Sequence, residues 1–130
     1  MFVDTSVIVA ILSKEPDAAE FANRMEEAAQ CHISALVILE ATMRLSTKLN
    51  IAPVEVEKRI WALMDAAEIA LVAMDAKTVS LAVQAFAEYG KGRGHPAQLN
   101  LADCFSYACA KSLGVPLLYK GKDFSCTDLG

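Results

Sequence analysis

The first twelve residues, which read MFVDTSVIVAIL, constrain the fold more than any other stretch. Phe2 and Val3 predict a short buried strand, because a strand covered on both faces reads as an unbroken apolar run. Asp4 follows at once, and a helix is expected to begin at Thr5 or Ser6. Ligands of open α/β sheets bind beyond the carboxyl ends of strands, so this carboxylate is well placed to hold a cation or act on a substrate. The alternative is that Asp4 only caps the helix.

Strand-like and helix-like segments alternate along the rest of the chain. Such alternation predicts a parallel sheet with helices on both faces. A chain of 130 residues suits one core, so we expect a single α/β domain over residues 1–130, with a small, mostly parallel sheet in a three-layer α/β/α sandwich. After the first helix, the expected helices are 18–29, 35–48, 54–66, 76–89 and 101–112, and the expected strands are 31–33, 69–74 and 115–119.

Hydrophobic residues make up 55% of the chain, more than the roughly 45–50% usual for a globular domain. A membrane span needs about 18 continuous apolar residues, and charges break every apolar run here well before that length. The first residues also lack the basic start of a secretory signal, and Asp4 interrupts them. We therefore expect a cytoplasmic protein with an apolar surface that a second copy or a partner covers.

Cysteine and histidine spacing predicts no zinc site. There is no CxxC pair, and two histidines are too few and too scattered for a histidine-based metal site. We expect buried free thiols, because a free cysteine behaves as a small apolar residue. The cysteines are Cys31, Cys104, Cys109 and Cys126.

Glu40 interrupts an otherwise apolar helix. Apolar residues fill almost every position from 36 to 43, as in a helix buried on all sides. Charged side chains are rarely fully buried unless they are paired. Arg44, four residues further on, could neutralise Glu40 across one turn. The other interpretation is that Glu40 faces a polar cleft at the end of the sheet.

Two further acids, Asp103 and Asp123, also lie next to the end of a predicted helix or strand. Asn100 predicts a helix N-cap, and Asp103 at the third helical position favours the helix dipole and can reach back to the cap. Apolar neighbours indicate that this helix end is buried. Asp123 follows the expected last strand. Asp75 is a weaker candidate, because a capping role explains it.

Asp4, Glu40, Asp103 and Asp123 could therefore meet at one edge of the sheet. Two like charges about 4 Å apart repel by about 4 kcal/mol at an effective dielectric constant near 20. Clustered carboxylates must take up protons or gain a counter-charge, and the apolar runs contain no matching lysines. Oxygen ligands favour Mg²⁺ or Mn²⁺ over zinc, and a water bound to such an ion can attack phosphorus.

The formal net charge of −4 argues, taken globally, against a nucleic-acid partner. Without the four clustered acids, however, 12 of the 16 acidic residues remain against 12 basic residues. The glycine-rich stretch 90–96 carries two basic residues and is interpreted as a loop over the site that contacts phosphate, or else as a plain surface turn. The basic residues that could ring the cleft are Arg44, Lys48, Lys91, Arg93, Lys120 and Lys122.

Four motifs together suggest a family. They are an N-terminal hydrophobic-V-D-T-S, a Glu near position 40 in an apolar helix, N-x-x-D-C-F-x-Y-A-x-A-K, and P-L-L-Y-K-G-x-D-F-x-x-T-D. This set resembles the PIN-domain nucleases and, more narrowly, the VapC toxins of bacterial type II toxin–antitoxin modules. The resemblance covers nearly the whole chain, and residues 100–128 are its most specific part.

The resemblance implies a PIN-like α/β/α fold and an endoribonuclease that depends on Mg²⁺ or Mn²⁺. It also implies a homodimer, or a heterotetramer or octamer with a VapB-type antitoxin that blocks the site. The acids that the family uses for catalysis and metal binding map onto Asp4, Glu40, Asp103 and Asp123. The first three are the firmer transfers, since the fourth is often less strictly required in the family.

By the same resemblance, Thr5 or Ser6 would orient Asp4 or a water, and Asp128 is a candidate outer-shell residue. An aspartate-nucleophile phosphatase would need a second Asp two residues after the first, where this chain has Ser6. The remaining alternative is a non-catalytic PIN-like module that binds a cation or a partner. The RNA target is not indicated by the sequence.

Overall fold

Four parallel strands form the middle layer of the protein, whose computed structural model describes residues 1–130. The strands are β1 (Phe2–Val3), β2 (Cys31–Ser34), β3 (Ile69–Val72) and β4 (Leu117–Leu118), in the spatial order β3-β2-β1-β4. Phe2 pairs with His32 on one side and with Leu117 on the other. Because every neighbouring pair is parallel, all four carboxyl ends lie at the same edge.

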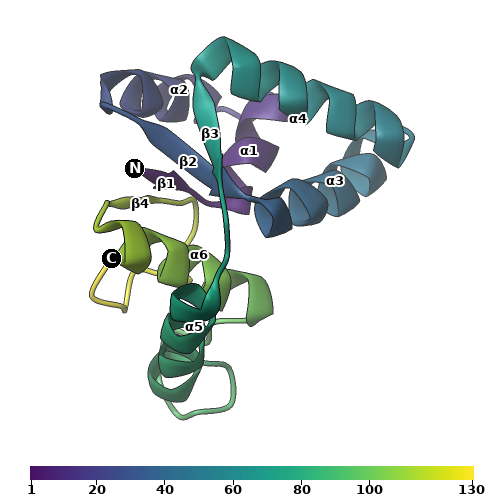
Figure 1. The fold of residues 1–130 in the computed structure, drawn as a ribbon. Helices are drawn as coiled ribbons and strands as arrows, with labels where there is room; N and C mark the ends of the chain where they lie inside the picture. The colour runs from purple at the N-terminus through teal and green to yellow at the C-terminus, as the bar shows by residue number, and fades with distance from the viewer.

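Helices cover both faces of this sheet (Figure 1). One layer contains α1 (Thr5–Leu12), α2 (Ala18–Glu27), α3 (Ala35–Leu49) and α4 (Pro53–Ala67). The other contains α5 (Ala76–Tyr89) and α6 (Leu101–Leu113). The predicted three-layer α/β/α architecture is therefore confirmed. None of the six helices is both long enough and apolar enough to cross a bilayer.

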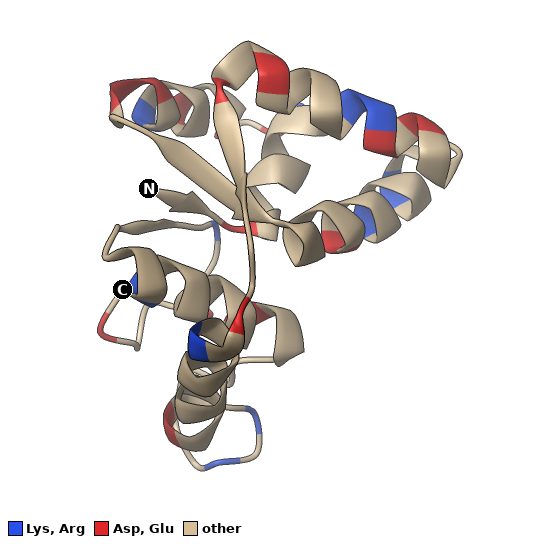
Figure 2. Cartoon of the chain, in the orientation of Figure 1, with Lys and Arg blue, Asp and Glu red and all other residues tan.

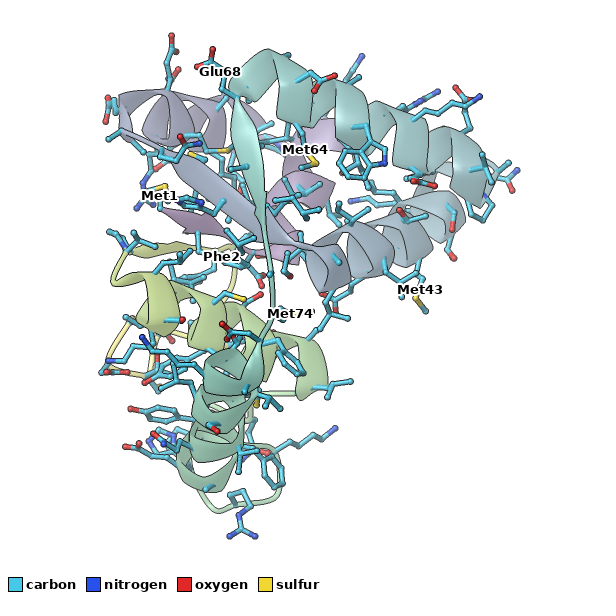
Figure 3. The ribbon with its side chains drawn as sticks, viewed as in Figure 1. Met1, Phe2, Met43, Met64, Glu68 and Met74 are labelled. Atoms are coloured by element: carbon cyan, nitrogen blue, oxygen red, sulfur yellow. The ribbon has the colours of Figure 1, made fainter.

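The core lies between the sheet and both helical layers and contains 31 buried apolar residues. Phe2 is fully buried and lies between the sheet and α6, while Met64 points from α4 toward the sheet (Figure 3). Cys31, Cys104 and Cys109 are buried free thiols, as predicted, whereas Cys126 is free but exposed. This core holds the strand ends in fixed positions, which in turn fixes the residues that follow them.

Capping residues set most helix boundaries where the sequence predicted them. The Ser34 side chain accepts a hydrogen bond from the Val37 N–H at the start of α3. Asn100 caps α6, and Gly114 ends that helix with a left-handed backbone at φ +66°, where glycine is favoured. The predicted strand 69–74 is shorter in the structure and ends at Val72.

Two apolar helix faces are more exposed than the sequence predicted. On α3, Leu39 is 57% exposed and Met43 is 61% exposed, and Met43 points away from the fold in Figure 3. The spacing of the apolar residues Val79, Ala82, Val83 and Phe86 predicts a core-facing stripe on α5, but of these only Ala82 is buried. The helix instead turns its small residues toward α6, and this orientation leaves the larger apolar side chains uncovered.

Candidate active site

Asp4 is the first residue after β1 and is also the N-cap of α1. Its Oδ2 accepts hydrogen bonds from the Ser6 backbone N–H at 3.1 Å and from the Ser6 hydroxyl at 2.6 Å. The Asp4 side chain is buried. The capping role and the position at the carboxyl edge of the sheet, which the sequence left as alternatives, therefore occur together.

Asp103 combines a cap with burial in the same way. Its Oδ2 accepts from the Asn100 N–H at 3.1 Å, while its own N–H donates to Asn100 Oδ1 at 2.9 Å. Only 8% of Asp103 is exposed. The pKa of this carboxyl is raised to about 7: burial is the largest cause, the Asn100 N–H acts in the opposite direction, and the negative charges of Asp4, Asp123 and Glu40 add to the rise. The fold therefore brings all four predicted acids into one electrostatic neighbourhood.

Glu40 and Asp123 form the outer part of this acidic cluster of Asp4, Glu40, Asp103 and Asp123. Glu40 is half-buried on α3, and no ion pair joins it to Arg44, so pairing across one helix turn does not explain it. Asp123 is exposed in the loop after β4. None of the four acids is in an ion pair with a lysine, arginine or histidine.

The donor set of the acidic cluster fits a hard divalent cation. It consists of carboxylate oxygens alone, which Mg²⁺ and Mn²⁺ accept and zinc disfavours. In this conformation no three side chains among Asp, Glu, His and Cys lie close enough together to form a ligand sphere. Without a bound cation, no counter-charge offsets the mutual repulsion of these carboxylates. What argues for a cation is the raised pKa of Asp103 with no basic partner nearby.

Two of the six basic residues that could ring the cluster are in ion pairs with other acids. Lys and Arg are distributed over both helical layers (Figure 2). Lys48 Nζ lies 2.8 Å from Glu15 Oε1, and Lys120 Nζ lies 3.1 Å from both Glu15 Oε2 and Asp17 Oδ1. The residues Lys14-Glu15-Pro16-Asp17 predict a turn, but nothing in them predicts these ion pairs. The alternation of two acids with Lys14 and Pro16 was the only signal available.

Asp128 is a structural anchor of the C-terminal segment. Its carboxylate accepts from the Tyr107 hydroxyl at 2.5 Å and from Lys111 Nζ at 2.7 Å. These two groups lower the pKa of Asp128, the Lys111 hydrogen bond being the larger influence. Asp128 is not among the acids that raise the pKa of Asp103. The contacts therefore favour Asp123 over Asp128 as the fourth member of the cluster.

The glycine-rich segment after α5 lies at the end of that helix farther from the sheet, in the lower part of Figure 1. A bridge between Gly90 and Leu99 closes its neck. The Arg93 guanidinium carbon lies 5.7 Å from the centre of the Phe86 ring. This placement does not match the expectation of a loop over the site.

Comparison with known proteins gives one consistent result. The family model described as "PIN domain" matches residues 1–128. A VapC ribonuclease, R02377, of Rhizobium meliloti is 43% identical, and the alignment covers 99% of this chain and 99% of that protein. The VapC ribonuclease Mb2780c of Mycobacterium bovis is 39% identical over 99% of this chain and 96% of its own. A ribonuclease VapC of Mycolicibacterium smegmatis is 41% identical, with 99% and 97% covered.

These matches span the strands, the helices and all four acids, and they agree with the parallel three-layer fold. The chain therefore belongs to the PIN-domain family, within its VapC branch.

Proposed function

We propose that this protein is a metal-dependent endoribonuclease and the toxin of a toxin–antitoxin module. One observation carries the proposal: Asp103 is 8% exposed and lies among three further carboxylates with no basic partner. An arrangement of this kind is costly for a protein that only needs to fold, and a divalent cation offsets the cost. The ribonuclease names of relatives at about 40% identity support the same conclusion.

Mg²⁺ or Mn²⁺ would be held by Asp4, Glu40, Asp103 and Asp123. When bound, such an ion supplies positive charge against the scissile phosphate and makes a bound water more acidic. The chain itself supplies orientation. The Ser6 hydroxyl at 2.6 Å fixes one oxygen of Asp4, and the Asn100 N–H at 3.1 Å fixes one oxygen of Asp103. Two ligand carboxylates are thus held in place before the substrate binds.

Metal-dependent cleavage is the direct test of this activity. The full chain, incubated with structured RNA, is expected to cut it when Mn²⁺ or Mg²⁺ is present and to leave it intact in EDTA. The Asp4→Asn variant keeps an oxygen that can cap α1 but loses the ligand charge, so it is expected to fold and to cut no RNA. Cleavage products resolved on a denaturing gel provide the measurement.

The rival proposal is a non-catalytic module of the same fold. Binding of Mn²⁺ without cleavage across a broad panel of RNAs would favour that module. Cleavage that persists in EDTA, or in Asp4→Asn, would contradict the proposed site and would indicate a contaminating nuclease. The panel must include transfer, ribosomal and messenger RNA fragments, because RNA is recognised largely by shape and by its single-stranded segments.

We further propose a homodimer that uses the uncovered apolar face of α5. Val79, Val83 and Phe86 share this face, and they line one groove together with Leu101 of α6, which is 72% exposed. Contiguous exposed apolar surface of this kind is typical of protein interfaces. An apolar groove beside the start of α6 would place two copies close to their acidic clusters.

Charge placed in the α5 groove is expected to dissociate the dimer. Val83 is 62% exposed in the single chain, so Val83→Glu does not disturb the core but puts a carboxylate at the interface. The matched control is Gln84→Glu, which adds the same charge one position further along but outside the groove. Sedimentation velocity is expected to detect a dimer for the wild type and the control, and a monomer for Val83→Glu. A monomeric wild-type protein, or a dimer in all three, would contradict this interface.

The proposed toxin function also implies an antitoxin partner and a cytoplasmic location. We propose a cognate VapB-type antitoxin that covers the acidic cluster and joins two toxins into a heterotetramer or an octamer. Because the substrate is cellular RNA, the activity belongs to the cytoplasm. Co-expression with the neighbouring small reading frame, followed by purification of a complex that is inactive on RNA, tests this.

A further inference from the structure

Lys120 contacts the site through its backbone and a neighbouring turn through its side chain. It lies two residues after β4 and three residues before Asp123. Its N–H donates to Ser6 Oγ at 2.9 Å, and the Ser6 hydroxyl in turn donates to Asp4 Oδ2 at 2.6 Å. One continuous chain of hydrogen bonds therefore joins the start of the Lys120–Asp123 loop to the first acid of the cluster.

The side chain of Lys120 is held by acids in the turn between α1 and α2. Its Nζ lies 3.1 Å from Glu15 Oε2 and 3.1 Å from Asp17 Oδ1, in the turn between α1 and α2. The other oxygen of Glu15 binds Lys48 of α3 at 2.8 Å. Isolated surface ion pairs contribute little, but a network of alternating charges with shared partners restricts every member. The hydrogen bonds from Lys48 and Lys120 lower the pKa of Glu15, so the network stays charged at neutral pH.

We propose that Lys120 is a positioning residue, which the Glu15–Asp17 turn holds so that the Lys120–Asp123 loop presents Asp123 to Asp4 and Asp103. This inference rests on the proposed function, since it assigns Asp123 to the proposed metal site. Asp123 is exposed, and the loop around it is anchored on two sides, by Lys120 before it and by the buried ring of Phe124 directly after it. Glu15, Asp17 and Lys120 thus act on the site through the loop and do not touch the ion or the RNA.

A positioning role and a purely electrostatic role for Lys120 predict opposite changes in cation affinity when its side chain is removed. If Lys120 were only a nearby positive charge, its removal would strengthen the binding of a divalent cation, because repulsion is lost and two acids are released. If Lys120 positions the loop, its removal would weaken binding, because Asp123 is no longer held. The sign of the change in metal affinity separates the two roles.

The experiment is a calorimetric titration of the full chain with Mn²⁺. We expect Lys120→Met to weaken binding on the order of tenfold, the usual effect of losing an outer-shell partner. Lys120→Arg keeps both ion pairs and is expected to stay close to wild type. Lys122→Met removes the same charge from the same loop at a side chain with no ion pair, so it shows the charge effect alone and is expected to leave the affinity unchanged or slightly tighter. Unchanged or tighter binding in Lys120→Met would overturn the proposal.

A double-mutant cycle tests whether the effect acts through Asp123. In an Asp123→Asn background, Lys120→Met is expected to cause no further loss, because the positioned ligand is already gone. An undiminished loss in that background would also overturn the proposal. These readouts need no RNA, so a cleaving wild type with an unaffected Lys120→Met variant defeats the positioning role alone. A wild type that binds no Mn²⁺ defeats the proposed metal site and the positioning role with it.

Discussion

The Asp103→Asn variant is expected to be more stable than the wild type without metal, and to be inactive on RNA. Burial and three nearby carboxylates raise the pKa of Asp103 from 3.8 to about 7, so ionising it at pH 8 costs about 4 kcal/mol. Asparagine removes that charge and keeps an oxygen that can accept from the Asn100 N–H. We expect the free energy of unfolding to rise by about 2–4 kcal/mol, which corresponds to a melting temperature higher by roughly 10 °C.

Thermal unfolding in EDTA, followed by circular dichroism, measures this effect. The matched control is Asp65→Asn, which neutralises an exposed acid on α4 that has no ion pair, and whose melting temperature is expected to stay within about 2 °C of wild type. A destabilised Asp103→Asn variant would mean that its capping contacts outweigh the charge repulsion. The premise of a crowded acidic cluster would then be wrong.

The loss of activity in the same variant is expected to exceed the roughly 10- to 100-fold cost of removing an outer-shell partner, because a ligand itself is lost. Opposite changes in stability and activity are the signature of a site that strains the fold in order to function. A variant that is merely damaged would lose both together.

The sequence predicted the acidic edge because each of its acids follows a recognisable local signal. Asp4 comes directly after a two-residue apolar strand, and Asn100 with Asp103 forms the capping box that the spacing indicated. For Asp4 and Asp103, capping and a functional role were alternatives. In the structure the cap orients each carboxylate, so capping is compatible with the proposed role as a metal ligand.

Long-range pairing is what the sequence did not predict. Lys120 and Glu15 are 105 residues apart in the chain, and Lys48 and Glu15 are 33 apart, so no periodicity connects them. The prediction that the apolar stripe of α5 faces the core was wrong for a related reason. Periodicity identifies an apolar face but not the element that covers it, and α5 packs on α6 through Ala82 and Ala85, whose small side chains let the two helices approach closely.

The pH dependence of stability is the second large effect expected from Asp103. The folded protein keeps the Asp103 proton up to about pH 7, whereas the unfolded chain releases it near pH 4. Between these values the folded state binds more protons, so this group makes the metal-free protein less stable as pH rises from about 4 to about 7. The change approaches about 1.4 kcal/mol per pH unit in the middle of that range.

Urea unfolding of the wild type and of Asp103→Asn between about pH 4 and pH 7 isolates the contribution of Asp103 to the free energy of unfolding. Glu15 and Asp128, whose lowered pKa values stabilise the fold as pH rises, contribute equally to both proteins and cancel in the difference. The advantage of the variant is expected to grow from near zero at about pH 4 to its full value above about pH 7. Saturating Mg²⁺ should remove most of that advantage, because a ligand at 100 times its Kd stabilises the folded wild type by about 2.7 kcal/mol. If Mg²⁺ leaves the difference in unfolding free energy between the wild type and Asp103→Asn unchanged, Asp103 is not a metal ligand. If the difference becomes small only when Mg²⁺ is added, the cation is what offsets the cost of ionising this buried carboxylate.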